Sequence, residues 1–239
     1  IAVAPPGFIN FTLSSDWLTR EVEEILAAGE EYGNFDLGKG AQVQVEFVSV
    51  NPTGPLHVGH GRGAILGSTL ANVLSAIGYK VVKEYYINDA GGQMDAFNRS
   101  LYARYQQALG IAAEMPSEGY FGQYMSELAK EIVAEQRDRF LAMPATEAMR
   151  ELGRIGMEKI IQSIKSDLEL LGVTFDLWFS ESSLYQQGQY EKSMSFLKEK
   201  AYTVEKEGAV WFVSTTLGED KDNVLVRSDG SPTYFASDI

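Results

Sequence analysis

The sequence has no cysteine and only two histidines among its 239 residues. The lack of cysteine excludes disulfides and thiolate metal sites, and two histidines are too few for a histidine-rich metal centre. We therefore expect no metal ion bound by the protein itself. No apolar run reaches the ~18 residues that a membrane span needs, and the N-terminus lacks a basic segment followed by an apolar one. These absences predict no membrane partner and a cytoplasmic location.

Basic residues are also scarce. The chain has 20 Lys and Arg against 33 Asp and Glu, which gives a net charge of −13. Phosphate neutralisation supplies most of the affinity of proteins for nucleic acids, so the whole surface cannot be a nucleic-acid-binding face. A tRNA would have to be held on a local basic patch or by parts absent from this chain. The 45% hydrophobic content suffices for an ordinary globular core.

A strand–turn–helix–strand pattern occupies the region after residue 40. The apolar, β-branched run at 43–50 predicts a buried strand, and residues 52–55 form a turn rich in proline and glycine. A helix of small residues follows at 59–77, and then a second strand at 80–87. In doubly wound folds, a glycine-containing turn that leads into a helix N-terminus binds phosphate.

The remaining elements alternate between helical and β-like patterns. They are long helical patterns at 93–109 and 120–171, broken near 115–116 and 143–144, a third strand of the same sheet at 175–179, a helix at 186–200, a β-like region at 202–226 and a helix that begins at Tyr234. That last helix has only a few residues before the chain stops, so we expect the chain to be truncated.

Both histidines lie in one four-residue stretch, His57-Val58-Gly59-His60, where the turn meets the helix. A spacing of three at a helix start places both imidazoles on one side. There they can donate hydrogen bonds to a phosphate whose charge rises during displacement at the α-phosphorus. Gly59 lacks a side chain, so a flat base could lie against the backbone. Taken alone, the stretch fits a nucleotide site and two incidental polar histidines equally well.

The surrounding residues favour the nucleotide site. The stretch VEFVSVNPTGPLHVGHGRGAILGSTLANVLSAIGYKVVKEYYINDAGGQ at 45–93 resembles the first nucleotide-binding motif of class I aminoacyl-tRNA synthetases, and within that class the arginine enzymes. Many class I members and related nucleotidyltransferases share His-x-Gly-His, whereas NPTGPLH followed by GRG is far narrower. The blocks YYINDAG at 85–91 and RSDGSPTY at 227–234 are two further resemblances. Together they cover nearly the whole chain in the right order.

The resemblance implies an α/β fold, a doubly wound, Rossmann-like class I synthetase domain that is split by a connective insertion. It also implies boundaries: 1–14 as the tail of an additional N-terminal domain, 15–40 as a helix and linker, 41–180 as the first half of the catalytic domain, 181–230 as the connective insertion, and 231–239 as the start of the second half. The family's lysine loop and anticodon-binding domain are missing from the chain. We therefore expect this fragment to bind ligands without turning them over.

The activity that the resemblance implies is arginyl-tRNA aminoacylation. Arginine is activated with ATP and then transferred to the 3′ end of cognate tRNA, with Mg²⁺ accompanying the ATP as a substrate and with tRNA held mainly by parts absent from this chain. His57 and His60 are the implied catalytic residues. The implied ATP-binding residues are Pro52, Thr53, Gly54, His57, Gly59 and His60.

Arginine presents a planar, permanently charged fork of donors, and its selection over lysine needs carboxylates placed for bidentate contact. By resemblance, Glu46, Tyr234 and Asp238 meet the guanidinium, whereas Asn51, with Ser49, holds the ammonium and carboxylate end. Tyr234 and Asp238 are four apart on a helix and share a face. Without the resemblance, Asp238 is an ordinary solvated residue. Glu46 interrupts an apolar strand, where a buried carboxylate needs a partner. We expect Glu46 and Asn51 to share a pocket with the histidines.

Several polar residues near these motifs allow two interpretations. Arg62 could contact a phosphate or form a surface ion pair. Asn88, Asp89 and Gln93 could lie near the site or serve as turn and cap residues. The aromatic pair at 211–212 is typical of a core and could also touch the tRNA end.

Two other functions are open on the residues alone. A small nucleotidyltransferase would share the His-x-Gly-His helix, yet it would lack the helical excursion at 90–180 and the pair formed by Tyr234 and Asp238. A binding module without catalysis would keep the fold and lose the chemistry. The presence of His57, His60 and Glu46 argues against such a loss.

Overall fold

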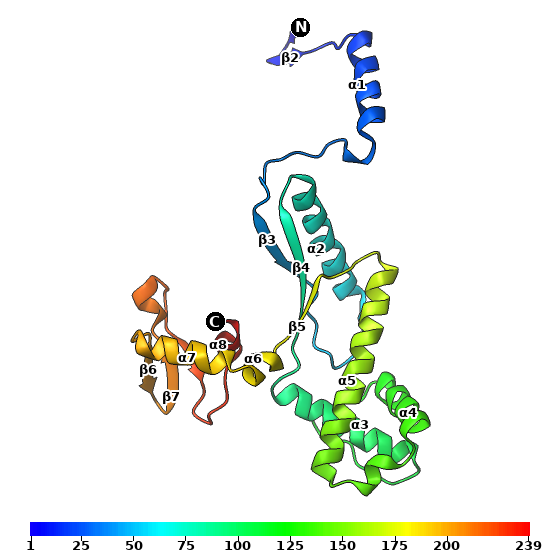
Figure 1. Ribbon diagram of the computed structural model, residues 1–239, viewed down its shortest axis with the longest axis vertical. Coiled ribbons are helices and arrows are strands. Elements are labelled where there is room, and N and C mark those ends of the chain that lie inside the picture. The colour runs from blue at the N-terminus through cyan, green and yellow to red at the C-terminus, as the bar shows by residue number, and fades with distance from the viewer. The chain divides into compact units, whose positions relative to one another are not determined.

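The computed structural model describes residues 1–239, and its elements follow the order expected from the sequence (Figure 1). Their bounds are β1 Ala2–Ala4, β2 Phe8–Asn10, α1 Ser15–Ala28, η1 Gly29–Glu31, β3 Gln42–Glu46, α2 Val58–Ala76, β4 Lys80–Ile87, α3 Gly92–Ala108, α4 Gln123–Gln136, η2 Arg139–Ala142, α5 Ala145–Leu170, β5 Leu177–Ser180, α6 Ser182–Gln186, α7 Gln189–Glu199, β6 Thr203–Lys206, β7 Ala209–Phe212, η3 Ser214–Leu217, β8 Asn223–Val226 and α8 Tyr234–Asp238.

The chain divides into two units, and the division passes through β3, α2 and β4. The first unit comprises residues 1–43 and 69–81, and the second comprises residues 44–68 and 82–239. In the first unit, β1 and β2 form an antiparallel hairpin, and the Ser14 side chain caps α1 by accepting a hydrogen bond from the Trp17 amide at 3.2 Å. No residue of α1 is buried.

A parallel sheet with the order β3-β4-β5 positions the candidate site. The β4–β5 pair is parallel and in register from Glu84 opposite Leu177 to Ile87 opposite Ser180. The β3–β4 pair is also parallel. The Lys80 amide donates a hydrogen bond to the Ala41 carbonyl at the start of both strands, and the Phe47 amide donates one to the Glu84 carbonyl further along both. The predicted third strand and the predicted doubly wound α/β architecture are both confirmed.

Small residues allow α2 to pack closely against this sheet. Ala64 is fully buried, and a Cβ added at Gly67 would overlap the ring of Phe47. The Phe47 ring in turn packs on Phe175, with 4.4 Å between centroids. The glycine at 67 therefore sets the distance between helix and strand.

The predicted long helices form one layer of three, α3, α4 and α5 (Figure 1). Their shared core contains Phe97, Leu101, Met125 and Ile132, which are all fully buried. On the surface, the Lys159 ammonium of α5 forms ion pairs of 2.7 and 2.6 Å with two glutamates of α4. This layer is rigidly packed.

The β-like region at 202–226 is a three-stranded antiparallel sheet with the order β6-β7-β8. Leu197 of α7, Leu225 of β8 and Ala236 of α8 form its own small core. The helix predicted at 186–200 is confirmed as α7, which begins at Gln189 because Gly188 before it adopts a left-handed conformation with φ of 69°. The short helix α6 precedes it. We call residues 182–236 the α/β module.

Candidate functional site

The backbone leaves β3 through two residues that are not glycine and have positive φ, Val48 at 66° and Ser49 at 42°. L-residues in this region cost about 1–2 kcal/mol each, so neighbouring contacts must hold them. The Ser49 hydroxyl accepts a hydrogen bond of 3.0 Å from the Tyr86 amide, and the Tyr85 hydroxyl donates one of 3.2 Å to the Val50 carbonyl. The predicted arginine-binding residue Ser49 is thus bonded to the backbone of β4.

The turn that follows holds the predicted ATP-binding residues Pro52, Thr53 and Gly54. Pro52 and Thr53 are buried. The Tyr124 hydroxyl of α4 donates a hydrogen bond of 2.8 Å to the Thr53 carbonyl. A Cβ added at Gly54 would lie 3.3 Å from that hydroxyl oxygen, so the turn and the tyrosine are in close contact.

The two histidine rings are stacked at the start of α2, with centroids 3.5 Å apart and planes 25° apart. The Nδ1 of His57 accepts a hydrogen bond of 3.1 Å from the Gly59 amide, and the Nδ1 of His60 accepts one of 3.3 Å from the His57 amide. Since each Nδ1 is an acceptor, the neutral rings carry their proton on Nε2 and can donate it to an anion. Burial, and secondarily the charge of His57, lowers the pKa of His60, which favours this neutral form.

Glu46 and Asp238, far apart in the sequence, line one cavity of about 610 Å³. We call it the acidic cavity. Its lining residues are Gln44, Glu46, Glu84, Tyr86, Phe179, Leu184, Ser237, Asp238 and Ile239. They include three carboxylates and no lysine or arginine. Asn51, His57 and His60 are not among them, so the structure joins Glu46 to Asp238 and not to the histidines.

Within the acidic cavity, burial and the charge of Glu46 oppose the ionisation of Glu84. Glu84 is only 8% exposed, and burial followed by the charge of Glu46 raises its pKa. The Gln44 amide donates a hydrogen bond of 2.7 Å to the Glu84 carboxylate. Because the amide is neutral, it does not offset the negative charge of Glu84. A cation in this cavity would relieve the repulsion between the carboxylates.

Glu181, which directly follows β5, is a candidate that the sequence motifs did not reveal. It is 5% exposed, and its Oε2 has no hydrogen-bond partner. Burial raises its pKa, and the charges of Asp89 and Asp238 raise it further. The Tyr86 hydroxyl is likewise buried without a partner, and burial and Glu181 raise its pKa. The position of Glu181 at the carboxyl end of a parallel strand was a signal that could have found it.

Tyr234 lines a different cavity of about 600 Å³, which also contains Gln93, Tyr185, Arg227 and Glu181. The Gln93 amide donates a hydrogen bond of 3.3 Å to the Tyr234 hydroxyl. Tyr234 and Asp238 therefore open into separate cavities, and Glu181 lines the one that contains Tyr234.

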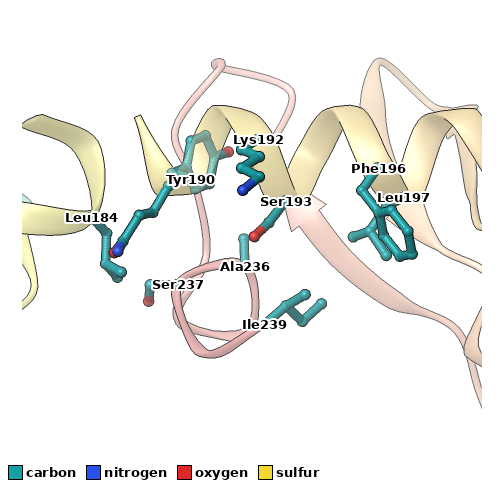
Figure 2. A pocket seen from close by; sticks show the side chains of 10 residues that line it. Leu184, Tyr190, Lys192, Ser193, Phe196, Leu197, Ala236, Ser237 and Ile239 are labelled. Atoms are coloured by element: carbon teal, nitrogen blue, oxygen red, sulfur yellow. The ribbon is translucent and has the colours of Figure 1, made fainter. Parts of the chain in front are cut away.

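An apolar cavity of about 560 Å³ lies between α7 and α8 (Figure 2). Leu184, Ser237 and Ile239 line both this cavity and the acidic cavity, so their side chains form a common wall. Ala236, which is 5% exposed, anchors α8 in the small core of the α/β module. This packing fixes the helix that carries Asp238.

The other predicted residues have varied surroundings. The Asp89 carboxylate accepts hydrogen bonds of 2.6 Å from the Ser180 hydroxyl and 2.8 Å from the Ser182 amide, so it connects the end of β4 to the end of β5 and the start of α6. Asn88 is half-buried, and Arg62 is exposed and forms no ion pair. No group of three or more His, Cys, Asp or Glu residues is placed to hold a metal ion. None of the helices is both long and apolar enough to cross a membrane.

Comparison with known proteins adds an independent line of information. Residues 21–239 match the family model described as tRNA synthetases class I (R), catalytic domain. The chain is 58% identical over all its residues to an arginine–tRNA ligase of Dehalococcoides mccartyi and 52% identical to one of Carboxydothermus hydrogenoformans, and it covers 43% of each. It thus spans less than half the length of these curated relatives.

Solved structures show a similar fold. One described as an arginyl-tRNA synthetase of Campylobacter jejuni superposes with a TM-score of 0.83 at 34% identity, over 95% of this chain and 49% of that one. The Thermus thermophilus arginyl-tRNA synthetase gives a TM-score of 0.64 at 23% identity, over 96% of this chain and 39% of that one. The second likeness concerns the fold alone.

Proposed function

Since the chain belongs to the family of class I tRNA synthetases (R), catalytic domain, we propose that it provides the arginine and ATP sites of an arginine–tRNA ligase. In the first step, the arginine carboxylate attacks the α-phosphorus of ATP, the bond to the β-phosphate breaks and pyrophosphate leaves. In the second, a ribose hydroxyl at the 3′ end of cognate tRNA attacks the arginyl carbonyl and AMP leaves. The ligase acts in the cytoplasm, and tRNA is held mainly outside these acidic residues.

The acidic cavity is the observation that carries this proposal. Glu46 and Asp238 present carboxylates to one cavity, with the buried Glu84 behind them. The N–H groups of a guanidinium point outward in its plane along more than one edge, and carboxylates pair with an edge through two parallel hydrogen bonds. Tyr86, which lines this cavity, adds a buried hydroxyl without a partner, and such a group costs free energy until a ligand satisfies it.

The stacked histidines provide the nucleotide side of the site. Their Nε2–H groups can stabilise the charge that develops on the α-phosphate. A Cβ at Gly59 would lie 2.9 Å from the His57 ring, so this glycine makes room for that ring. In-line attack by the arginine carboxylate needs positioning and charge stabilisation and no protein nucleophile. Mg²⁺ would arrive with the ATP phosphates, whose oxygens are ligands that this ion prefers.

We assign Asn51 to the ammonium and carboxylate groups of the bound arginine. Asn51 is exposed and follows shortly after Val48 and Ser49, the two residues with positive φ. Ser49 contributes by shaping that backbone, because its hydroxyl is already bonded to Tyr86. Gln93 holds Tyr234 beside Glu181. Arg62 is free to contact a phosphate.

Calorimetric titration of the 239-residue chain with arginine, citrulline and lysine tests the proposal. Citrulline has the shape of arginine with a neutral urea head, and lysine has the charge without the planar fork. We expect arginine to bind at least about 30-fold more tightly than citrulline, since an unpaired carboxylate pair costs about 2 kcal/mol or more. Equal affinity for the two, or no binding by a chain whose circular dichroism shows it folded, would contradict the proposal. Pyrophosphate exchange is not expected of this chain by itself, which covers 43% of its curated relatives, so ligand binding and not turnover is the readout.

A further inference from the structure

The layer formed by α3, α4 and α5 contributes one polar group to the candidate site. The Tyr124 hydroxyl, in the first turn of α4, donates a hydrogen bond of 2.8 Å to the carbonyl of Thr53, 71 residues earlier in the sequence. Thr53 is 7% exposed, and a buried carbonyl needs a partner. No side chain of the turn itself supplies that partner.

Tyr124 lies on a helix that is packed into the layer formed by α3, α4 and α5. Its neighbour Met125, and Leu128 one turn later, are buried in the core of the layer. The ion pairs of Lys159 fix α4 to α5 on the outer side. Burial raises the pKa of Tyr124 to about 12, and the nearby Tyr120 contributes, so the hydroxyl remains a donor over the usual range of assay pH.

The turn held by Tyr124 leads directly into the histidine pair. Only Pro55 and Leu56 separate Gly54 from His57, and the hydrogen bonds of the histidine rings run to backbone amides of the same segment. A shift of the turn would therefore move both rings. A Cβ at Gly54 would be 3.3 Å from the Tyr124 hydroxyl oxygen, so the turn has little room to approach α4 further.

We propose that Tyr124 is a positioning residue of the nucleotide site, whose hydroxyl fixes the turn at 52–54 and through it the start of α2 with His57 and His60. This rests on the proposed function for the identity of the nucleotide as ATP. It assigns a role in ATP binding to the helical layer, which the motifs of the sequence did not connect with the site. Tyr124 itself touches the backbone of the turn and not the reacting atoms.

The test compares Tyr124→Phe with Tyr120→Phe in the 239-residue chain. The Tyr120 hydroxyl forms no hydrogen bond and its ring packs on Phe97, so the control removes the same atom from the same region without touching the turn. Hydrogen exchange by mass spectrometry reports on peptides that cover 52–60, and calorimetry gives the dissociation constants of ATP and arginine.

In Tyr124→Phe we expect the amides of 54–60 to exchange faster, and the dissociation constant of ATP to rise about two- to tenfold, as the loss of one hydrogen bond allows. The arginine constant should rise less than the ATP constant, because only Asn51 adjoins the turn and the lining of the acidic cavity does not include it. Tyr120→Phe should change neither. A hydroxyl with a merely structural role would lower the melting temperature without separating ATP from arginine.

Unchanged exchange and unchanged ATP affinity in Tyr124→Phe would overturn the proposal, as would equal losses for ATP and arginine. If the wild-type chain binds no ATP at all, the proposed function fails. The exchange of 54–60 in the two variants still decides whether Tyr124 holds the turn.

Discussion

The histidine pair and the acidic cavity differ in how the chain brings their residues together. His57 and His60 are three residues apart at one helix start, and their geometry follows from backbone amides that bond to the rings. The acidic cavity takes Glu46 from β3, Glu84 from β4 and Asp238 from α8. The histidine pair is local in sequence, and backbone hydrogen bonds determine its geometry. The acidic cavity is formed by residues from three distant elements, and its main property is its negative charge.

This difference implies different sensitivities. The histidine region should respond to changes that move α2 relative to β3, and little to changes of charge elsewhere. The acidic cavity should respond to the loss of a single carboxylate, because like charges already oppose one another there. The predictions below test this division from the largest effect to the smallest.

The largest effect is expected for Asp238→Asn. Asp238 is exposed in the free chain, and bound arginine would cover it and pair with it. Removing one member of a desolvated charge pair costs about 2–5 kcal/mol, or roughly 30- to 5000-fold in affinity. We expect titration to show this loss for arginine and an ATP affinity within about twofold of the wild type.

Two other substitutions control this result. Asp220→Asn makes the same change at an exposed position outside the cavities and should alter neither affinity. His60→Ala should do the reverse of Asp238→Asn, with ATP binding impaired and arginine binding kept. If Asp238→Asn leaves arginine binding unchanged, Asp238 is an ordinary helix residue and specificity rests on Glu46.

An intermediate effect is expected for Gly67→Ala. The added methyl group would overlap the ring of Phe47, and overpacking of a core costs about 1–3 kcal/mol. Gly63→Ala, four residues earlier on the same helix, meets nothing within 4 Å and should raise stability by about 0.5–1 kcal/mol through helix propensity. Urea denaturation of both variants measures the contrast. Equal stabilities would show that the helix–strand distance is not set by Gly67.

The smallest effect is expected for Glu84→Gln, and it depends on pH. Burial and Glu46 raise the pKa of Glu84 in the folded chain, so the folded state binds protons more tightly than the unfolded state and its stability falls as pH rises through that window. The variant should therefore melt at a higher temperature than the wild type at pH 7. Below about pH 4 the carboxyl is protonated in both states and the difference should vanish. A difference independent of pH would indicate a packing effect.

The local patterns of the sequence predicted most of the fold. The strand at 80–87 has the predicted bounds, and the parallel third strand and the break between the long helices are present. Hydrophobic periodicity and turn residues suffice for such elements because each depends on neighbours in the chain. The helix predicted at 186–200 is present as α7, and only its start differs, because the left-handed Gly188 lies directly before Gln189.

The candidate site could be predicted only where a motif is local or a resemblance supplies the rest. The histidines follow from their spacing, and Asp238 was named through resemblance alone. Glu181 depends on burial after β5, and Tyr124 on a hydrogen bond across 71 residues. Neither residue has a neighbour in sequence that identifies its role. Ser49 was assigned to the ligand, and its bond to the Tyr86 amide could be seen only once the strands were paired.

The burial of Ala236 has a consequence for local unfolding. The helix that carries Asp238 is anchored in the small core shared with Leu197 and Leu225, so it belongs to the same cooperative unit as β8. Opening of that unit would release Asp238 while the parallel sheet stays folded. By thermodynamic linkage, arginine bound through Asp238 would stabilise the α/β module against local unfolding. The affinity for arginine and the local stability of the module would therefore change together.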